Sequence, residues 1–424
     1  MKVLFVSQSP INASISVGNT FLNVFEGFEN VEFGSLYSKN GLPDVRVKDA
    51  FRISEKMILK SFLGKTVGET VNGRYNGEKV VDNKATGFAK RKRWTIFFWL
   101  QNLIWRWPSW KSKKLKAFLT EYNPDVIFTL LSDSFPLNRM IRFTQKYTKK
   151  PLFLYAWDDN YSMKTSGKSP FKKINRLISR KNMRKTVKKV SQFYVISQMQ
   201  KIEYEAWFQR ECKILTKSED FSLEPCFKER FESPLRFVFT GNLGMNRWKS
   251  LAMIARVLQR INNDDVKAQL YIYSGNELTD EMRKALNVEG SSFFMGSVPA
   301  DQVIGLQADA DVLVHVEGLD KKSRNAVHQS FSTKLVDYFK AARPILAVGP
   351  RGVASIEHLR ENNCAVLAET EEELFDGLSS IVNAPEKLQI LANNAYNCGK
   401  KHHDKSLMKE MLKTDIYQAC ERTK

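Results

Sequence analysis

The chain has 424 residues, of which 43% are apolar and 26% charged, and it carries a formal net charge of +20. These proportions are those of a folded protein and exclude a disordered or collagen-like chain, and the length exceeds one ordinary domain core. The excess of positive charge predicts an anionic partner, such as nucleic acid, phospholipid head groups or a phosphorylated substrate.

The N-terminal segment and the cysteines indicate the compartment. MKVLFVSQSP has too few apolar residues for a signal peptide, and no run reaches the roughly 18 apolar residues that cross a bilayer. Five widely spaced cysteines, with no CxxC pair, support neither a disulfide framework nor a zinc site. We therefore expect a cytoplasmic protein that is neither secreted nor membrane-spanning.

Short apolar runs bounded by Gly, Pro, Ser and Asp alternate with longer segments of helical period, which predicts an α/β protein with parallel, doubly wound sheets. In the first half of the chain the predicted strands are 2–9, 31–38, 125–133, 151–159 and 192–198. In the second half they are 235–242, 268–275, 292–298, 311–318, 344–350 and 364–369. The pattern predicts two sheets of five or six strands each.

The polar segment 216–234 contains two prolines and is expected to connect two domains. Helical spacing recurs after the last strand, within 371–382, 386–398 and 405–420. We expect domains at 1–213 and 214–404, with 405–424 packing back on the first. In open parallel sheets ligands bind at the carboxyl ends of the strands, so the cleft between the domains is the expected site.

The stretch RKRWTIFFWLQNLIWRWPSWKSKK, residues 91–114, places five of the eight tryptophans among clusters of Lys and Arg. A helix over 94–107 would be apolar around most of its circumference, with one narrow polar stripe. Tryptophan favours the head-group boundary of a bilayer, and polybasic flanks attract anionic lipid. We predict membrane contact by Trp94, Phe98, Trp105, Trp107 and Trp110. The alternatives are a core helix with a solvated charged face, or a stacking platform for single-stranded nucleic acid, for which no familiar module is present.

A second basic segment runs from Lys164 to Lys189, with eleven Lys or Arg and no acidic residue. Arg176 and Arg180 recur in it at helical spacing, and we expect them to extend the membrane-facing edge.

The segment FTGNLGMNRWKSLAMIARVL begins at the end of a predicted strand and leads into a helix. Its glycines, Gly241 and Gly244, with Asn242 between them, would let backbone amides approach an anion. Arg247 would reach the same phosphates with two N–H groups. The alternative is an ordinary turn between a strand and a helix.

The segment HQSFSTKLVDYFKAARPILAVGP, residues 328–350, predicts a second phosphate site. Ser332 and Thr333 precede a helix as candidate caps. Lys334 would neutralise a phosphate, and Asp337 would accept hydrogen bonds from the two hydroxyls of a ribose. A solvated salt bridge between Lys334 and Asp337 is the alternative.

In this order the motifs resemble a GT-B glycosyltransferase, with two Rossmann-like domains, and in particular the retaining group 4 family (glycosyltransferase family 4) that builds bacterial surface polysaccharides. The resemblance covers about 190–400. It rests on Gly241 and Arg247 in FTGNLGMNR, on Gly296 and Val298 in FFMGSVPADQVIGLQADADVLV, where the family has a loop that supports the nucleobase, and on Asp337 in SFSTKLVDYF.

The chain departs from the family pattern at one of its two acidic positions. Gln329 stands where the family has its first acidic residue, and Ser332 replaces the turn glycine. The resemblance still implies donor binding around Gln329, whereas the role of the first acid toward the sugar hydroxyls is in doubt.

The resemblance also assigns residues in the first half of the chain. In YAWDDNY, Trp157 and Asp158 match the family's His-Asp pair that faces the donor sugar. Ser9, Gly18 and Asn19 match the loop whose amides meet the leaving phosphate. A structural loop glycine at position 18 is the alternative, and the Asp-Asp pair is not expected to bind metal.

The implied activity is transfer of a sugar from a nucleotide-diphosphate sugar to a lipid-linked saccharide acceptor in capsule, O-antigen or exopolysaccharide synthesis, with retention of configuration and without a metal or cofactor. Positive groups at the leaving diphosphate would stabilise the transition state. The enzyme would sit on the inner face of the plasma membrane, with no nucleic-acid partner. The five histidines are expected to have packing or surface roles. A nucleotide-sugar epimerase with the same fold, and a membrane-bound homologue without activity, remain alternatives.

Overall fold

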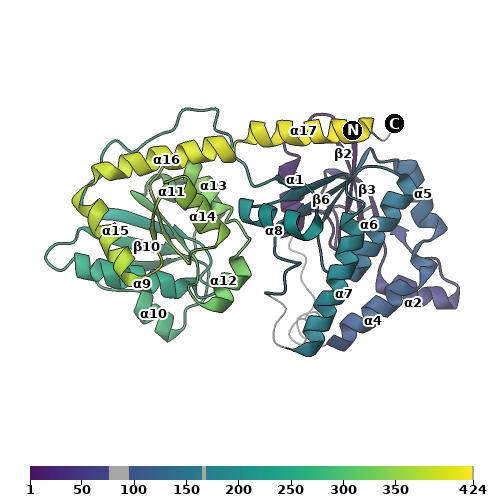
Figure 1. The fold of residues 1–424 in the computed structure, drawn as a ribbon, viewed down its shortest axis with the longest axis horizontal. Helices are drawn as coiled ribbons and strands as arrows, with labels where there is room; N and C mark the ends of the chain where they lie inside the picture. The colour runs from purple at the N-terminus through teal and green to yellow at the C-terminus, as the bar shows by residue number, and fades with distance from the viewer. Residues whose placement is uncertain (76–94, 165–168, 423–424) are drawn as a thin grey trace. The chain divides into compact units, whose positions relative to one another are not determined.

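The computed structural model describes residues 1–75, 95–164 and 169–422, with only the backbone described for Ser16 and for residues 95–98. Two compact units make up the chain. The first comprises 1–196, 201–215 and 409–424, and the second comprises 197–200 and 216–408. Both units are α/β structures (Figure 1). Of the helices in the described ranges, none has the length and apolar character needed to cross a membrane.

Within the described residues, the sheet of the first unit has eight strands in the order β4-β3-β2-β1-β5-β6-β7-β8. Strand β4 is antiparallel to β3, and all other pairs are parallel. The strands are β1 (Lys2–Val6), β2 (Glu32–Tyr37), β3 (Val47–Arg52), β4 (Glu69–Thr70), β5 (Val126–Leu130), β6 (Leu152–Ala156), β7 (Gln192–Val195) and β8 (Lys213–Ile214).

Helices cover both faces of this sheet. They are α1 (Ser16–Val24), α2 (Glu55–Lys60), η1 (Ser61–Leu63), α4 (Thr95–Arg106), η2 (Pro108–Trp110), α5 (Lys113–Tyr122), α6 (Phe135–Thr148), α7 (Pro170–Val187), α8 (Gln198–Phe208) and the greater part of α17 (Lys405–Glu421). Ser54, Ser112 and Ser134 begin α2, α5 and α6 by accepting a hydrogen bond from a backbone N–H of the first turn.

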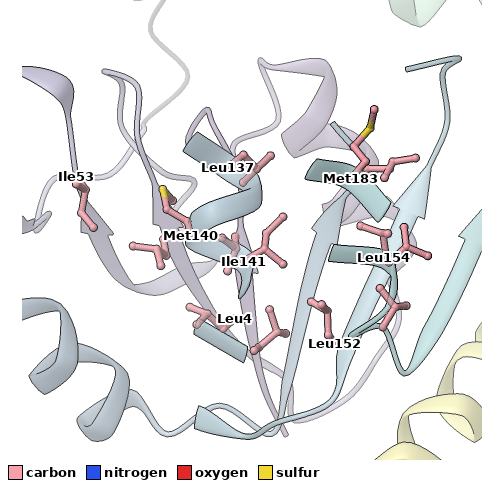
Figure 2. Close-up of a cluster of buried hydrophobic side chains, with 14 of the residues drawn as sticks. Leu4, Ile53, Leu137, Met140, Ile141, Leu152, Leu154 and Met183 are labelled. Carbon is pink, nitrogen blue, oxygen red and sulfur yellow. The ribbon is translucent and has the colours of Figure 1, made fainter. Parts of the chain in front are cut away.

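The apolar side chains of the strands separate into two layers because successive residues point to opposite faces of the sheet. One layer packs under α4, α5, α6 and α7, and Figure 2 shows part of it, with Leu4, Leu152 and Leu154 of the strands near Met140 of α6 and Met183 of α7. The other layer is aromatic. Its rings include Phe5 and Phe21, whose centroids lie 5.0 Å apart, and Phe128.

The second unit, which is described throughout, has a parallel sheet of six strands in the order β11-β10-β9-β12-β13-β14. The strands are β9 (Leu235–Thr240), β10 (Ala268–Tyr273), β11 (Ser292–Gly296), β12 (Val312–Val316), β13 (Ile345–Val348) and β14 (Ala365–Ala368). Its helices are α9 (Arg247–Ile261), α10 (Asp280–Leu286), α11 (Ala300–Ala308), α12 (Lys321–Val327), α13 (Lys334–Lys340), α14 (Ala354–Glu361), α15 (Glu371–Asn383) and α16 (Glu386–His402).

The GT-B fold class predicted from the sequence is confirmed, and so are the six strands of the second half and the three C-terminal helices. The prediction of five or six strands was wrong for the first sheet. It missed β3, whose sequence VKDAFR mixes charged and apolar residues, and the two-residue strands β4 and β8, which are too short to give a pattern.

The last helix links the two units along the chain, because α17 begins in the second unit and continues in the first. Asp415 of this helix is buried and accepts a hydrogen bond from the Tyr194 hydroxyl at 2.7 Å. The same carboxylate lies 2.5 Å from Nζ of Lys213. The end of the chain therefore completes the polar contacts at β7 and β8 of the first sheet.

Candidate functional site

The glycine-containing loop between β9 and α9 is held in shape by its own amides. The Gly241 N–H donates to Tyr273 O at 2.9 Å, that of Leu243 to Asn276 Oδ1 at 2.9 Å, and that of Gly244 to Asn242 Oδ1 at 2.6 Å. The amides of Gly241, Leu243 and Gly244 are therefore already engaged within the protein. The predicted approach of backbone amides of this loop to an anion stays a prediction.

Contacts with the loop after β12 fix the far end of this turn. The carbonyl of Met245 accepts a hydrogen bond from Ser323 Oγ at 2.9 Å, and Asn246 donates to Asp320 Oδ2 at 2.7 Å. Asp320 also accepts hydrogen bonds from Ser323, and the bonds from Asn246 and Ser323 hold the pKa of Asp320 well below its usual range. Gly318 is required at this point because a Cβ there would overlap Met245 O. These hydrogen bonds thus hold the two loops together at the carboxyl ends of β9 and β12.

Arg247, the first residue of α9, forms an ion pair with Glu317, the residue after β12. Its Nη2 lies 2.8 Å from Glu317 Oε2, and its Nε donates to the same oxygen at 3.0 Å. The side chains are 23% and 4% exposed, respectively. Burial raises the pKa of the Glu317 carboxyl, and the guanidinium of Arg247 opposes that shift. The arginine predicted to meet a phosphate is thus held along one edge by a buried carboxylate.

Lys334, the first residue of α13, lies against the loop that carries Gly241 and Arg247. Its Nζ occupies the space that a Cβ on Gly241 would need, and it lies 5.5 Å from the centroid of the Phe239 ring. Burial lowers the pKa of Lys334, as does repulsion from Arg247, while Glu317 opposes the shift. Lys334 thus packs directly against Gly241, and Arg247 and Lys334 belong to one site.

His315 lies beside these charges on β12. It is 5% exposed, and its Nε2 is 3.7 Å from Glu317 Oε1, with no hydrogen-bond partner among the described residues. Burial, Arg247 and Lys334 together lower its pKa to about 3, so the imidazole is neutral at pH 7. His315 and Glu317 were not predicted as site residues. A usable signal was present in DVLVHVEG, where two polar side chains two residues apart interrupt a buried strand.

Asp337 pairs with a lysine that the sequence analysis did not consider. Lys217, in the segment 216–234, donates to Asp337 Oδ1 and also lies 3.6 Å from Glu219 Oε1. Burial raises the pKa of Asp337, and Lys217 opposes that shift. The acid expected to bind a ribose is therefore in a formed ion pair before any ligand arrives. The alternative pairing of Asp337 with Lys334 is not formed.

The residues before α13 differ from the expectation. The Ser332 N–H donates to Ser355 Oγ at 2.9 Å, so this amide is not directed at a phosphate. Thr333 is the N-cap residue, but its side chain makes no capping hydrogen bond to a described residue. Gln329 is completely buried, and its amide oxygen lies 3.5 Å from Gln200 Nε2. Of these three predicted donor-binding residues, only Thr333 is exposed.

Gly296 ends β11 and Val298 follows it; β11 is the edge strand of the sheet and lies two strands away from β9. Gly296 has φ of +78°, a conformation that favours glycine, and Val298 is partly exposed. Their predicted contact with a nucleobase stays a prediction.

In the first unit, the predicted residues gather at the carboxyl ends of β1 and β6. The Ser9 carbonyl accepts a hydrogen bond from Ser7 Oγ at 2.5 Å, and Asn19 is exposed on α1. Gly18 lies within α1 rather than in a loop, and a Cβ there would overlap the backbone of Asn12. Close packing against Asn12 therefore explains a glycine at this position.

Trp157 and Asp158 directly follow β6. The Trp157 ring lies 5.6 Å from the Tyr155 ring and 6.0 Å from that of Phe21, between centroids, which places it at the end of the aromatic layer. Asp158 is exposed. Their predicted role toward a donor sugar stays a prediction.

The aromatic stretch divides between core and surface. Trp105 and Trp110 are 0% and 1% exposed, so their predicted membrane contact is wrong. Trp105 Nε1 donates to Glu55 Oε1 at 2.9 Å, and the two indoles lie 5.6 Å apart in the core. Trp107 is 50% exposed and its ring contacts that of Phe62. Trp94 and the side chain of Phe98 lie outside the described part of the chain.

Of the two arginines predicted to contact a membrane, one is largely buried and the other is partly exposed. The side chain of Arg176 is only 13% exposed, and it donates to the carbonyl of Asn160, so its predicted membrane contact is wrong. Arg180 is partly exposed, with its guanidinium 4.5 Å from the centroid of the Tyr161 ring.

A second polar cluster of the second unit lies between α14 and α16. The Nε2 atoms of His358 and His403 are 3.1 Å apart, and Cys398 Sγ is 3.2 Å from His358 Nε2. The His403 ring stacks on Phe331, and its Nδ1 lies 3.4 Å from Lys217 O. The expected packing role applies to both histidines. Among the described residues, no group of three or more His, Cys, Asp or Glu is arranged to hold a metal ion.

The comparisons with known proteins agree with this architecture. Residues 234–384 match the family described as "Glycosyl transferases group 1". A search of curated proteins finds no match.

Several solved structures have the same fold over nearly the whole chain. The structure of Anabaena Alr3699/HepE in complex with UDP has a TM-score of 0.62 at 12% identity, covering 99% of this chain and 100% of that one. A glycosyltransferase from Rickettsia africae ESF-5 gives 0.58 at 11% identity, covering 99% and 98%. Sucrose-phosphate synthase from Thermosynechococcus elongatus gives 0.57 at 11% identity, covering 98% of each chain. Residues 234–384 thus match the model of a group 1 glycosyl transferase domain, in a chain that has the GT-B fold of glycosyltransferases.

Proposed function

We propose that this protein is a retaining, metal-independent glycosyltransferase that moves a sugar from a nucleotide-diphosphate sugar to a membrane-lipid-linked saccharide in capsule, O-antigen or exopolysaccharide synthesis. The observation that carries the proposal is the convergence of Arg247 and Lys334 at the carboxyl ends of β9 and β12, within the group 1 domain. In open parallel sheets this edge is where ligands bind.

The chemistry of the transfer explains why two cations are needed together. As the bond between the sugar and the diphosphate breaks, negative charge builds up on the leaving oxygen and the sugar becomes oxocarbenium-like. Fixed positive groups at that oxygen stabilise the transition state more than the bound substrate. Arg247 offers N–H groups in a fixed fork, and Lys334 offers a compact charge.

The donor side of the proposal includes the nucleoside. We assign Asp337 to the ribose hydroxyls, with Lys217 sharing or releasing the carboxylate when a donor binds, and Gly296 and Val298 to the base. The related Alr3699/HepE structures contain UDP and, in one case, UDP-glucose, which supports a uridine nucleotide as the first donor to test. In the first unit, Trp157 and Asp158 are assigned to the sugar and the acceptor.

A nucleotide screen tests the donor assignment without knowledge of the acceptor. Purified protein is heated with UDP-, GDP-, ADP- and dTDP-sugars, because a ligand present at 100 times its Kd stabilises the native state by about 2.7 kcal/mol. We expect one nucleotide class to raise Tm in the wild type and not in Lys334→Ala. Lys249→Ala, an exposed lysine on α9, is the matched control and should respond like the wild type.

The result of this screen has a definite negative outcome. If no nucleotide sugar raises Tm, or if Lys334→Ala responds as strongly as the wild type, the donor site is not where we place it. If a donor is found, the anomeric configuration of the product, read by NMR, decides between retention and inversion. An epimerised free sugar would indicate the epimerase alternative.

Membrane association is proposed from an apolar strip on the first unit. Its residues are between 40% and 78% exposed and come from α2, η1, α4 with the residue that follows it, and α7. They are Leu59, Phe62, Leu63, Trp99, Leu100, Leu103, Trp107, Phe171, Ile174, Leu177 and Ile178. Helices α4 and α7 both pack against α6 (Figure 1), and Lys172 and Lys173 of α7 are exposed.

We propose that this strip binds the anionic inner face of the plasma membrane, in the cytoplasm, where a lipid-linked acceptor is held. Apolar side chains would enter the head-group boundary while lysines such as Lys172 and Lys173 pair with anionic lipid. Sedimentation with phosphatidylglycerol vesicles tests this. We expect binding at low salt, release at high salt, and weaker binding by Leu103→Ser and Leu177→Ser. Ile390→Ser, an exposed apolar residue of the second unit, is the control. Equal binding to neutral vesicles would contradict the electrostatic part.

A further inference from the structure

The carboxylate of Glu317 is the one anionic group of the described structure that pairs with Arg247 by a salt bridge. An anion directly behind a diphosphate site weakens ligand binding by simple charge repulsion, so its presence there needs an explanation. The sequence analysis gave it no role, and the transfer chemistry described above does not use it.

Glu317 is itself held rigidly, which suits a residue that sets the place of another. Its N–H donates to Val348 O at 2.8 Å, as part of the contact between β12 and β13. Its carbonyl accepts a hydrogen bond from Ser250 Oγ of α9 at 2.7 Å. The side chain is 4% exposed, so it has little freedom to turn toward water. The carboxylate is therefore fixed relative to both the sheet and α9.

The geometry of the ion pair leaves part of the guanidinium available. Nε and Nη2 of Arg247 both point at Glu317 Oε2, at 3.0 and 2.8 Å. The guanidinium has five N–H donors in a planar fork, so the edge with Nη1 remains directed away from the carboxylate. The side chain is 23% exposed, which is enough for that edge to be reached.

The surroundings of Lys334 explain why a negative charge is needed. The charged groups that shift the pKa of Lys334 are Arg247, Glu317 and Asp337, and Lys334 in turn lowers the pKa of His315 on β12. Asp337 already pairs with Lys217. His315 is neutral, so Arg247 is an uncompensated neighbour unless Glu317 is ionised. A buried lysine beside a second cation loses its proton readily.

We propose that Glu317 is a positioning residue of the donor site: it aligns Arg247 along the Nε–Nη2 edge and balances the positive charge that Arg247 and Lys334 bring to the site. This inference rests on the proposed function, because it assumes that Arg247 and Lys334 hold a diphosphate. Glu317 touches neither substrate nor reacting atoms, and it acts only through the two cations.

The test is the pH dependence of nucleoside diphosphate binding. Calorimetry with UDP, GDP, ADP and dTDP is carried out from pH 7.5 to pH 10.5 on the wild type, Glu317→Gln, Lys334→Arg and Glu371→Gln. Affinity should fall as Lys334 loses its proton at alkaline pH, and this part of the fall should be absent from Lys334→Arg, whose guanidinium keeps its charge. In Glu317→Gln, an amide oxygen still accepts from Arg247 but the charge is lost. The alkaline fall should therefore begin about one pH unit lower, which is the lower end of the effect of a close opposite charge.

Glu371→Gln is the control, since its carboxylate is on the surface beside Arg256 and Arg260. Its alkaline fall should coincide with that of the wild type. If Glu317→Gln also coincides with the wild type, or if its affinity is lower by the same factor at every pH, Glu317 is a structural residue and the inference is wrong. If the wild type binds none of the four nucleotides, the proposed function fails and the inference falls with it. Circular dichroism at each pH confirms that the variants are folded.

Discussion

The buried pair His358 and His403 makes the free energy of unfolding of the second unit depend on pH. Burial is the main cause that lowers the pKa of His358 to about 4 and that of His403 to about 3, and the neighbouring histidines lower them further. An unfolded histidine has a pKa of about 6.5. The unfolded state therefore binds more protons than the folded state at acid pH. The contribution of the two histidines to the free energy of unfolding is fully present above about pH 6.5 and is lost as the pH falls.

The size of the effect follows from the two pKa values. At pH 5.0 an unfolded histidine is protonated and a folded one with a pKa near 3 or 4 is not, which costs about 2 kcal/mol of stability for each residue. His403→Gln should therefore reduce the loss of unfolding free energy between pH 7.5 and pH 5.0 by about 2 kcal/mol. It also loses the stacking of His403 on Phe331, but that loss is the same at both pH values.

The assay must report the second unit alone. Hydrogen exchange of peptides from α14 and α16, measured in increasing urea and corrected for the intrinsic exchange rate, gives its unfolding free energy at each pH. His402→Gln is the matched control, because His402 is the adjacent residue and is less buried. It should remove a smaller part of the pH dependence. If His403→Gln keeps the full wild-type difference between the two pH values, the histidine pair is not the source of the acid sensitivity.

Three further predictions concern the site and the aromatic stretch. Arg247→Ala should lower the unfolding free energy by about 3 kcal/mol because it leaves the buried Glu317 without its cation, and an unchanged urea midpoint would contradict this. Trp105→Ala should destabilise the first unit by about 3–5 kcal/mol, whereas Trp107→Ala should cost less than about 0.5 kcal/mol; urea denaturation compares the two. Asp337→Asn should weaken nucleotide-sugar binding by about 1–3 kcal/mol, and equal affinity in calorimetry would remove Asp337 from the ribose site.

The parts of the second unit that could be predicted from the sequence are those set by local pattern. Each of its strands is a short apolar run, and the loop after β9 has the glycine against which Lys334 packs. Arg247 and Lys334 were each predicted to bind a phosphate, and the resemblance to the GT-B family placed both at one leaving diphosphate. The ends of parallel strands meet at one edge, so position in the chain predicts proximity in space.

The partners of those residues could not be predicted in this way. Glu317 is 70 positions from Arg247, and Lys217 is 120 positions from Asp337. Such pairs depend on how loops approach one another, and many acidic or basic side chains in the chain satisfy the same local pattern. The periodicity of the tryptophan-rich helix likewise shows which residues share a face, but not which face the rest of the unit covers. Trp105 faces α2 and the core, while Trp107 faces outward.

The placement of α17 has a consequence for biosynthesis. On the ribosome, the first unit emerges early, yet Asp415, which pairs with Tyr194 and Lys213, is made only after the whole of the second unit. The second unit, encoded between them, can complete its sheet while the first still lacks its closing helix. The first unit therefore acquires its native set of contacts only after the second has been synthesised, and a nascent chain stalled before residue 409 should expose the uncovered part of the first unit to chaperones.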